Sequence, residues 1–202
     1  FDGNLIKPED ASTQKSYQIV FTHEYNFKAW DRPFVLTSEF YYKYLKDIIP
    51  YEVDNIRIRY FADQKATGYA SGLDLRINGE FVKGIESWAS ISFMKSAENI
   101  KYYLSPTGTI LSQTDVNNGA VYVCDTLIKG IPRPSDQKVN ISLFFQDYIP
   151  FIPSFKVNLK LVFGTGMPFG QPYSERYKHI MRMSPYRRVD IGFSKQLISN
   201  KS

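Results

Sequence analysis

The sequence predicts an all-β fold: an antiparallel up-and-down meander that forms part of a transmembrane β-barrel. Three observations support this prediction. Apolar and polar residues alternate over long stretches, tight turns and long loops follow one another in turn, and no apolar run reaches the ~18–20 residues of a membrane-spanning helix. We expect residues 1–202 to be one partial barrel domain with about seven wall strands.

The composition agrees with β-structure. Aromatic residues make up 16% of the 202 residues, and such residues fit a pleated surface. The net charge is +5, but Lys and Arg are scattered, which favours a solvated surface over a nucleic-acid site. The single cysteine, Cys124, excludes an internal disulfide and leaves the redox compartment open. Because the chain opens at Phe1 in mid-pattern, we expect a fragment or a processed piece.

The stretch 137–163 carries the clearest alternation, and the rest of the chain is organised around it. It predicts two long strands joined by a tight, Pro-bearing turn at 149–153. Successive side chains on a strand point to opposite faces, so each strand has one apolar and one mostly polar face. The apolar faces hold Val139, Ile141, Leu143 and Phe145 on the first strand, and Val157, Leu159, Leu161 and Phe163 on the second.

The same alternation predicts five further strands, at 16–29, 34–44, 67–81, 87–95 and 186–195. Tight turns are expected at 30–33, 82–86 and 149–153, and long loops at 46–65, 96–134 and 164–185. Within the second loop, Asn118-Gly119 predicts a small hairpin between 109–115 and 120–126. Glycines within the strand 67–81 indicate a bend or a close backbone approach.

Two architectures fit the alternation. A strand of a soluble β-sandwich has the same pattern, so a secreted β-domain that binds glycan or protein through its loops is the alternative. Short turns at one end and long loops at the other are typical of an outer-membrane barrel, with its short periplasmic turns and longer extracellular loops. The predicted strands also exceed the ~5–6 residues of a typical soluble strand.

Several segments resemble one known family. They are VDNIRIRY (53–60), ATGYASGLDLR (66–76), PRPSDQ (132–137), FFQDY (144–148) and PYRRVDIGFSK (185–195). In this order they resemble the barrel of TonB-dependent outer-membrane receptors of the Bacteroidetes type, and the likeness extends from about residue 15 to residue 195. It lies in wall segments and includes no catalytic signature.

The resemblance implies a location in the cell outer membrane, in contact with its lipid. Members of this family have an N-terminal plug inside a barrel of ~22 antiparallel strands. They take up scarce nutrients with energy from a TonB–ExbB–ExbD complex, which acts through an N-terminal region that we expect to lie outside these 202 residues. The chain would then be a late stretch of barrel that lacks both ends. It would contribute wall and ligand-capturing extracellular loops to uptake of an unknown nutrient.

The polar faces supply the candidate site residues. We expect nine of them to face the lumen and contact the plug or solute. They are Glu24, Glu39, Lys43, Asp74, Arg76, Asn140, Asn158, Arg188 and Asp190. For the seven charged ones, the alternative is ion pairing across strands in a hydrated interior. Candidate ligand-loop residues are Tyr102, Tyr103, Tyr122, Tyr173 and Tyr177, although packing within the loops is an equal alternative.

No enzymatic activity is expected. The two histidines, His23 and His179, lie far apart without partners at metal-ligand spacing, and Cys124 has no histidine nearby to act as a base. We therefore expect no catalytic residues, no metal and no cofactor. An enzyme on a β-scaffold would need clustered acid–base residues, and the sequence shows none.

Overall fold

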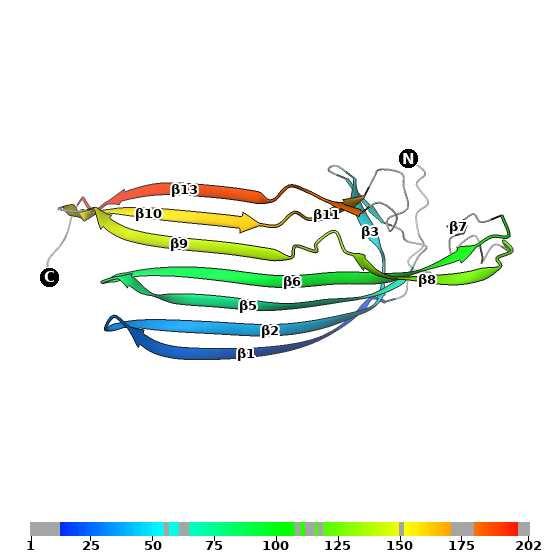
Figure 1. The fold of residues 1–202 in the computed structure, drawn as a ribbon, viewed down its shortest axis with the longest axis horizontal. Coiled ribbons are helices and arrows are strands. Elements are labelled where there is room, and N and C mark those ends of the chain that lie inside the picture. The colour runs from blue at the N-terminus through cyan, green and yellow to red at the C-terminus, as the bar shows by residue number, and fades with distance from the viewer. Residues whose placement is uncertain are drawn as a thin grey trace.

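The computed structural model describes residues 13–54, 57–60, 65–107, 110–111, 116, 119–149, 152–170 and 180–197. Within them the chain is all-β, and its main sheet has nine strands. Seven of them follow one another across the sheet (Figure 1). They are β1 (Lys15–Ala29), β2 (Arg32–Ile48), β5 (Ala66–Val82), β6 (Ile85–Leu104), β9 (Val139–Ile149), β10 (Ile152–Gly164) and β13 (Tyr186–Lys195).

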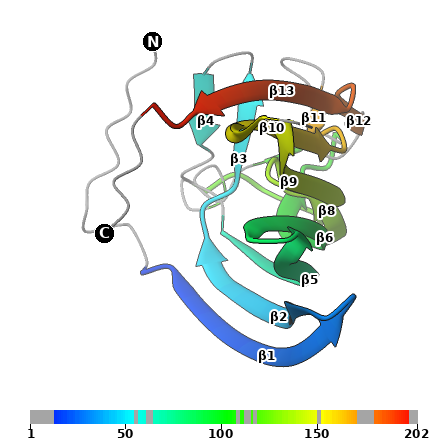
Figure 2. The same cartoon turned by 90° about the vertical axis from the view of Figure 1, so that its left-hand side faces the viewer.

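Each neighbouring pair along this path is antiparallel, so the predicted antiparallel meander is confirmed. The sheet is a single open arc when seen end-on (Figure 2). It does not close within the described residues, because β1 and β13 are its two end strands. None of the described residues belongs to a helix long and apolar enough to cross a membrane.

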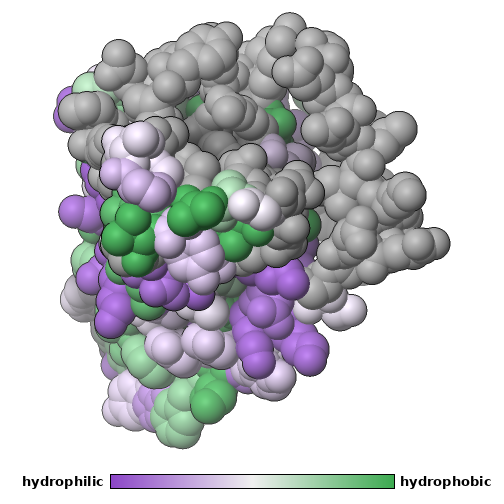
Figure 3. All heavy atoms as spheres, turned by 90° about the vertical axis from the view of Figure 1, so that its right-hand side faces the viewer, coloured by the Kyte–Doolittle hydropathy of each residue, from purple (hydrophilic) through white to green (hydrophobic). Residues whose placement is uncertain are grey.

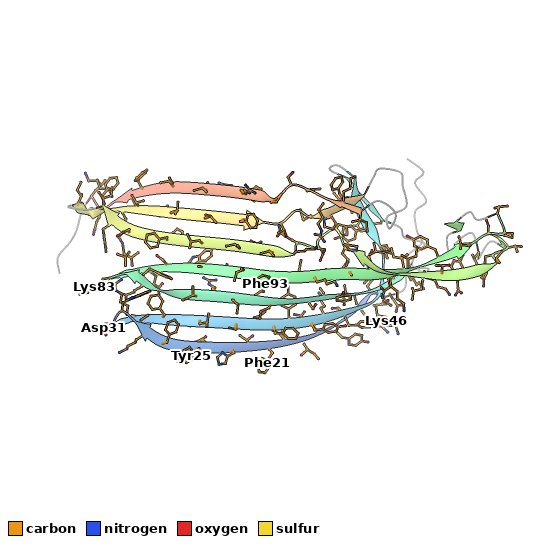
Figure 4. The ribbon with its side chains drawn as sticks, viewed as in Figure 1. Phe21, Tyr25, Asp31, Lys46, Lys83 and Phe93 are labelled. Carbon is orange, nitrogen blue, oxygen red and sulfur yellow. The ribbon has the colours of Figure 1, made fainter. Side chains whose placement is uncertain are left out.

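The tight turns join strands at one end of the sheet, which we call the turn end. Trp30 and Asp31 connect β1 to β2, with φ angles of 53° and 58°. Two successive positive φ angles match the twist of a two-residue hairpin. Gly84, with a φ of 75°, serves the turn between β5 and β6. Figure 4 shows Asp31 and Lys83 at this end and Lys46 towards the other.

The opposite end, the loop end, contains the remaining short strands (Figure 1). Two separate hairpins lie within the predicted long loops. The first is β3 (Tyr51–Asp54) with β4 (Arg57–Tyr60), and the second is β11 (Pro168–Gly170) with β12 (Ile180–Arg182).

The strand β6 runs further than the sequence predicted, to Leu104 instead of Lys95. Its last residues pair with β8 (Cys124–Pro132) and with the two-residue β7 (Ile110–Leu111). Residues 124–126, which were predicted to form a small hairpin with 109–115 around Asn118-Gly119, pair with β6, and so do Ile110 and Leu111. Residues 109, 112–115, 117 and 118 of that prediction lie outside the described residues. A long partner strand offers more ladder hydrogen bonds than a local turn can provide.

Apart from Phe34 and Ile85, which lie at the turn end, the buried apolar residues gather where β2, β5, β6 and β8 meet at the loop end. This cluster lies at the loop end of the sheet and does not extend along its length. It contains Leu45, Ile48, Ala66, Ile100, Tyr102 and Ile131, with Ile128 packed against it.

Candidate functional site

The pairing register places the apolar positions of all seven long strands on one face of the sheet, the apolar face. Residues that pair across an antiparallel ladder point to the same side. One such row crosses the whole sheet, from Tyr25 on β1 to Val189 on β13. Between them it passes through Leu36, Ile77, Ala89, Leu143 and Leu161.

The apolar face is exposed. The side chains of Phe21, Phe40 and Phe93 are 71%, 54% and 42% exposed, although β2 and β6 have a strand on each side. Figure 4 shows Phe21 and Tyr25 along β1, at the edge of the sheet. On β13, the side chains of Val189, Ile191 and Phe193 are also exposed. Within the described residues, no second layer covers this face.

The apolar face is larger than the apolar patches found on the surface of a typical soluble monomer. Seven strands spaced about 4.8 Å apart, each with about ten residues of ~3.3 Å, give a face on the order of 1,000 Å². The largest apolar patch on a typical soluble monomer is about 300–600 Å², and larger patches mark surfaces that contact protein or membrane. A face of this size is typical of a surface that contacts protein or lipid.

Aromatic residues border the apolar face at both ends of β1, β2 and β5. Near the loop end, Tyr17 stacks on Tyr44 with ring centroids 6.5 Å apart, and Tyr42 stacks on Tyr69 at 6.4 Å. At the turn end, the Phe34 ring packs against Phe27, Trp30 and Phe81 at centroid distances of 5.6, 5.9 and 5.1 Å. Tyr and Trp have an apolar body and a polar tip, which suits a boundary between apolar and aqueous surroundings.

The spacing between the two aromatic borders can be estimated along β1. Tyr17 and Phe27 lie on the same face, about ten residues or ~33 Å apart along the strand. A strand tilted by about 40° would reduce this length to a height of about 25 Å, which is the height of the lipid-facing band of an outer-membrane barrel.

The opposite face, the polar face, contains all nine predicted lumen residues. Their register positions are Glu24 on β1, Glu39 and Lys43 on β2, Asp74 and Arg76 on β5, Asn140 on β9, Asn158 on β10, and Arg188 and Asp190 on β13. The structure thus brings residues from six strands to one side of the sheet. Their role as lumen residues stays a prediction.

The polar face is crowded around its glycines. The Tyr41 ring lies over Gly72 of the neighbouring strand, and Asn158 lies over Gly192. Side chains converge on the inner side of a curved sheet and spread apart on the outer side. Tyr41 is half-buried, whereas Phe40, on the other face, is exposed. We infer that the polar face is the inner face of the arc.

Charged groups on the polar face are held mainly by neighbours on their own strand. The Arg76 Nε donates to the Asn78 Oδ1 at 2.9 Å, and its guanidinium lies 4.9 Å from the centre of the Trp88 ring. Arg188 pairs with Asp190, two residues along β13, at 2.9 Å. This ion pair runs along one strand, whereas the sequence analysis considered ion pairs across strands. Glu39 and Asp74 lie directly opposite each other, and like charges in that position repel.

The loop end contains two buried ion pairs that the sequence analysis missed. The Glu98 side chain is fully buried, and its Oε2 lies 3.2 Å from the Arg133 Nε. The Arg133 guanidinium also lies 5.8 Å from the centre of the Tyr51 ring. This contact connects residue 133, which follows β8, to the β3–β4 hairpin.

The second ion pair joins Asp136 to Arg182, on β12. The buried Asp136 carboxylate also accepts from the Ser96 backbone N–H at 2.6 Å. Arg182 donates to the backbone oxygens of Asp136 and Gly166, at 2.9 and 3.1 Å. We call these contacts the Arg182 clasp. The Arg182 clasp fastens the segment after β8 and the base of the loop before β13 to β6. In the sequence, the segment PRPSDQ (132–137) points to these contacts. Its prolines make the connector rigid, and Arg133 and Asp136 each need a partner of opposite charge.

The predicted ligand-loop tyrosines occupy different surroundings. Tyr102 and Tyr103 are only 7% and 8% exposed, and Tyr102 belongs to the buried cluster, so packing describes these two residues. Tyr122 is 46% exposed, and its ring meets that of Tyr103 edge-on at 5.1 Å. Tyr173 and Tyr177 lie outside the described residues. Figure 3 looks onto the loop end, where hydrophilic and hydrophobic side chains are intermixed.

Beyond the aromatic border, Lys101 on β6 and Asp125 on β8 form an exposed ion pair at 2.7 Å. The hydrogen bond to Lys101 lowers the pKa of the Asp125 carboxyl below its usual value, and the same bond raises the pKa of Lys101. The described residues contain no cluster of three or more side chains able to hold a metal ion.

Comparisons with protein-family models, curated proteins and solved structures found no match to this chain. The family resemblance therefore rests on the segments quoted from the sequence.

Proposed function

We propose that this chain is part of the wall of a transmembrane β-barrel, with its apolar face in the lipid of an outer membrane and its polar face towards the interior. The single observation that carries the proposal is the exposed apolar face, which continues across all seven long strands without a second layer over it within the described residues. The hydrocarbon tails of lipids can cover such a face without a complementary protein surface.

Two further observations support the proposal. The aromatic borders are spaced about one lipid-facing band apart. The tight turns and the long loops also lie at opposite ends of the sheet (Figure 1). In a barrel with this arrangement the loop end is extracellular, and Tyr122 is its most accessible candidate for ligand contact among the described tyrosines of the predicted loop set.

The transport role remains part of this proposal. By the resemblance, the wall and loops belong to a TonB-dependent receptor that captures a nutrient outside the cell and imports it with energy from the inner membrane. The nine polar-face residues would then line the path or contact the plug. The proposed role needs no catalytic group.

A soluble β-domain is the alternative, and it requires a partner sheet about 10 Å from the apolar face. A labelling experiment separates the two. In a Cys124→Ser background of the intact protein in phosphatidylcholine vesicles, single-cysteine variants are labelled with bimane, and quenching by brominated lipid is measured.

Adjacent residues provide matched controls, because they face opposite sides of one strand. We expect brominated lipid to quench the labels at Leu73→Cys and Ile91→Cys and to spare those at Asp74→Cys and Ser90→Cys. Equal quenching within each pair, or a protein that stays monomeric in buffer with Leu73→Cys unreactive, would overturn the proposal.

A further inference from the structure

Four basic residues lie on the apolar face near its loop end, one on each of four strands. We call them the loop-end cations: Lys15 on β1, Lys46 on β2, Lys95 on β6 and Arg187 on β13. All four residues are exposed, and none of their side chains forms an ion pair or a hydrogen bond with another described residue. Their charges are therefore left without a counter-charge in the described part of the chain.

Two of the loop-end cations repel each other. Lys15 and Lys46 lie directly opposite in the ladder between β1 and β2. The Cβ atoms of such a pair are roughly 4.5–5.5 Å apart, and like charges at this position are destabilising. Asp47, the next residue on β2, lies at a shift in register and forms no ion pair with either lysine. An anion that contacts both ammonium groups would turn this repulsion into attraction.

The loop-end cations lie beside the aromatic border. Lys15 is two residues beyond Tyr17, and Lys46 is two residues beyond Tyr44, on the same face (Figure 4 labels Lys46). Two residues span about 6.6 Å along a strand. Tyrosines of membrane proteins gather at the level of the lipid headgroups, so the two ammonium groups reach that level. Lys95 lies one step inside the border, and its long stem can carry its charge outwards.

The turn end of the apolar face differs in charge. There Arg32 and Lys195 are balanced in part by Asp147, and the Arg32 guanidinium donates to the backbone oxygen of Phe81 at 2.5 Å. Asp147 is the only acidic residue at the described apolar-face positions of the seven long strands. Near the loop end these strands therefore place cations on the apolar face without acidic residues.

We infer that the loop-end cations bind the phosphate groups of anionic lipids in the leaflet at the loop end. This inference rests on the proposed function and adds to it, because an apolar face alone does not distinguish headgroups by charge. Lysine and arginine at a membrane surface attract anionic lipids. The cations continue the apolar face and its tyrosine border, which favours a lipid over an acidic protein as the occupant.

Spin-labelled lipids measure which headgroup the protein prefers. The intact protein is inserted into phosphatidylcholine vesicles with traces of spin-labelled phosphatidic acid or spin-labelled phosphatidylcholine, and electron paramagnetic resonance gives the immobilised fraction of each. We expect a preference for phosphatidic acid of at least about fivefold, the effect of one cation near an anionic surface. Sodium chloride at about 1 M should remove the preference, because the Debye length falls to about 3 Å.

Two variants with the same loss of charge locate the preference. The outer variant carries the changes Lys15→Gln, Lys46→Gln, Lys95→Gln and Arg187→Gln. The inner variant, the matched control, changes four lysines at polar-face positions: Lys28→Gln, Lys43→Gln, Lys156→Gln and Lys160→Gln. We expect the outer variant to immobilise both lipids equally and the inner variant to keep the preference of the parent protein.

Three results would overturn the inference. The parent protein could show no preference, which would favour an acidic protein as the occupant. The outer variant could keep the preference, or the inner variant could lose as much of it as the outer variant does. A variant with Lys15→Arg and Lys46→Arg retains both charges and should keep the preference of the parent protein, and a loss there would count against binding by charge.

The bimane experiment at Leu73 separates this inference from the proposed function. If brominated lipid quenches the label at Leu73→Cys but the parent protein does not prefer phosphatidic acid, the apolar face lies in lipid and only the inference fails. If brominated lipid does not quench that label, the proposed function fails first.

Discussion

At the scale of single residues, the polar face depends on glycines that admit side chains from the next strand. A Cβ at Gly72 would lie 2.6 Å from the backbone oxygen of Phe93 and would also meet the Tyr41 hydroxyl. The three atoms nearest to a Cβ at Gly192 all belong to the Asn158 side chain, which can rotate away. The surroundings of Gly192 can therefore accommodate a Cβ more easily than those of Gly72.

Alanine at these glycines should have unequal effects. Gly72→Ala is expected to lower the free energy of unfolding by about 1–3 kcal/mol, because backbone must shift. Gly192→Ala should have an effect near zero, because alanine also recovers about 0.5–1 kcal/mol that glycine costs within a strand. Urea unfolding of the intact protein in detergent micelles measures both. Equal losses would show that the Phe93 carbonyl is not the obstacle.

The Arg182 clasp is the second feature at this scale. Arg182→Gln leaves the buried Asp136 carboxylate with the Ser96 N–H but without its cation. Hydrogen bonds to charged groups contribute about 1.5–3 kcal/mol, so we expect a loss of roughly 2 kcal/mol. Limited proteolysis near residues 133–138 should become faster.

Arg188→Gln is the matched control, because Arg188 also pairs with an aspartate but lies exposed. Exposed pairs contribute about 0–1 kcal/mol. If Arg182→Gln unfolds no more readily than Arg188→Gln, the Arg182 clasp does not hold the loop end together.

At the scale of elements, β6 and β8 form a ladder that extends beyond the aromatic border. The exposed pair of Lys101 and Asp125 lies on this ladder. The pKa of the Asp125 carboxyl is lowered from 3.8 in the folded state, so the unfolded chain binds a proton at a higher pH than the folded chain does. The contribution of the pair is present above the unfolded value and is lost as the pH falls through the folded value.

This pair predicts a local effect of pH. Hydrogen-exchange protection of Thr126 and Leu127 should fall when the pH is lowered from 6 to a value below the folded pKa of Asp125, because the carboxylate then loses its charge. Asp125→Asn should show the lower protection at both values, since it lacks the charge. If Asp125→Asn shows the same fall in protection as the parent protein, a group other than Asp125 causes the effect.

At the scale of the whole molecule, the sheet has two faces of opposite character and one layer. A cation on the lipid-facing side of a barrel wall costs about 2–4 kcal/mol at the bilayer midplane, whereas changes on the inner side are tolerated. Leu73 and Asp74 are adjacent on β5 and point to opposite faces, so they test this difference within one strand.

Leu73→Arg should lower the stability of the membrane-inserted protein by about 2–4 kcal/mol. Asp74→Arg should change it by less than about 1 kcal/mol and can stabilise it, because it replaces a like charge opposite Glu39 by an opposite one. Reversible folding into phosphatidylcholine vesicles in guanidinium measures both. Equal effects of the two arginines would argue against lipid on the apolar face.

The sequence by itself determined the seven long strands, apart from the end of β6, together with the tight turns and the two faces. Alternation with a period of two is a local property, and it predicted the last strand, Tyr186–Lys195, with the observed bounds. It also placed the nine candidate lumen residues on the polar side, because face assignment needs only odd and even positions along each strand.

Only the tertiary structure decided which distant segments meet. Residues 124–126 pair with the end of β6, and Asp136 pairs with Arg182, 46 residues away. Loop contacts of this kind depend on geometry that no local period records. The position of β1 and β13 as the two end strands also emerged only when all seven strands were aligned, because the order of strands is a property of the whole sheet.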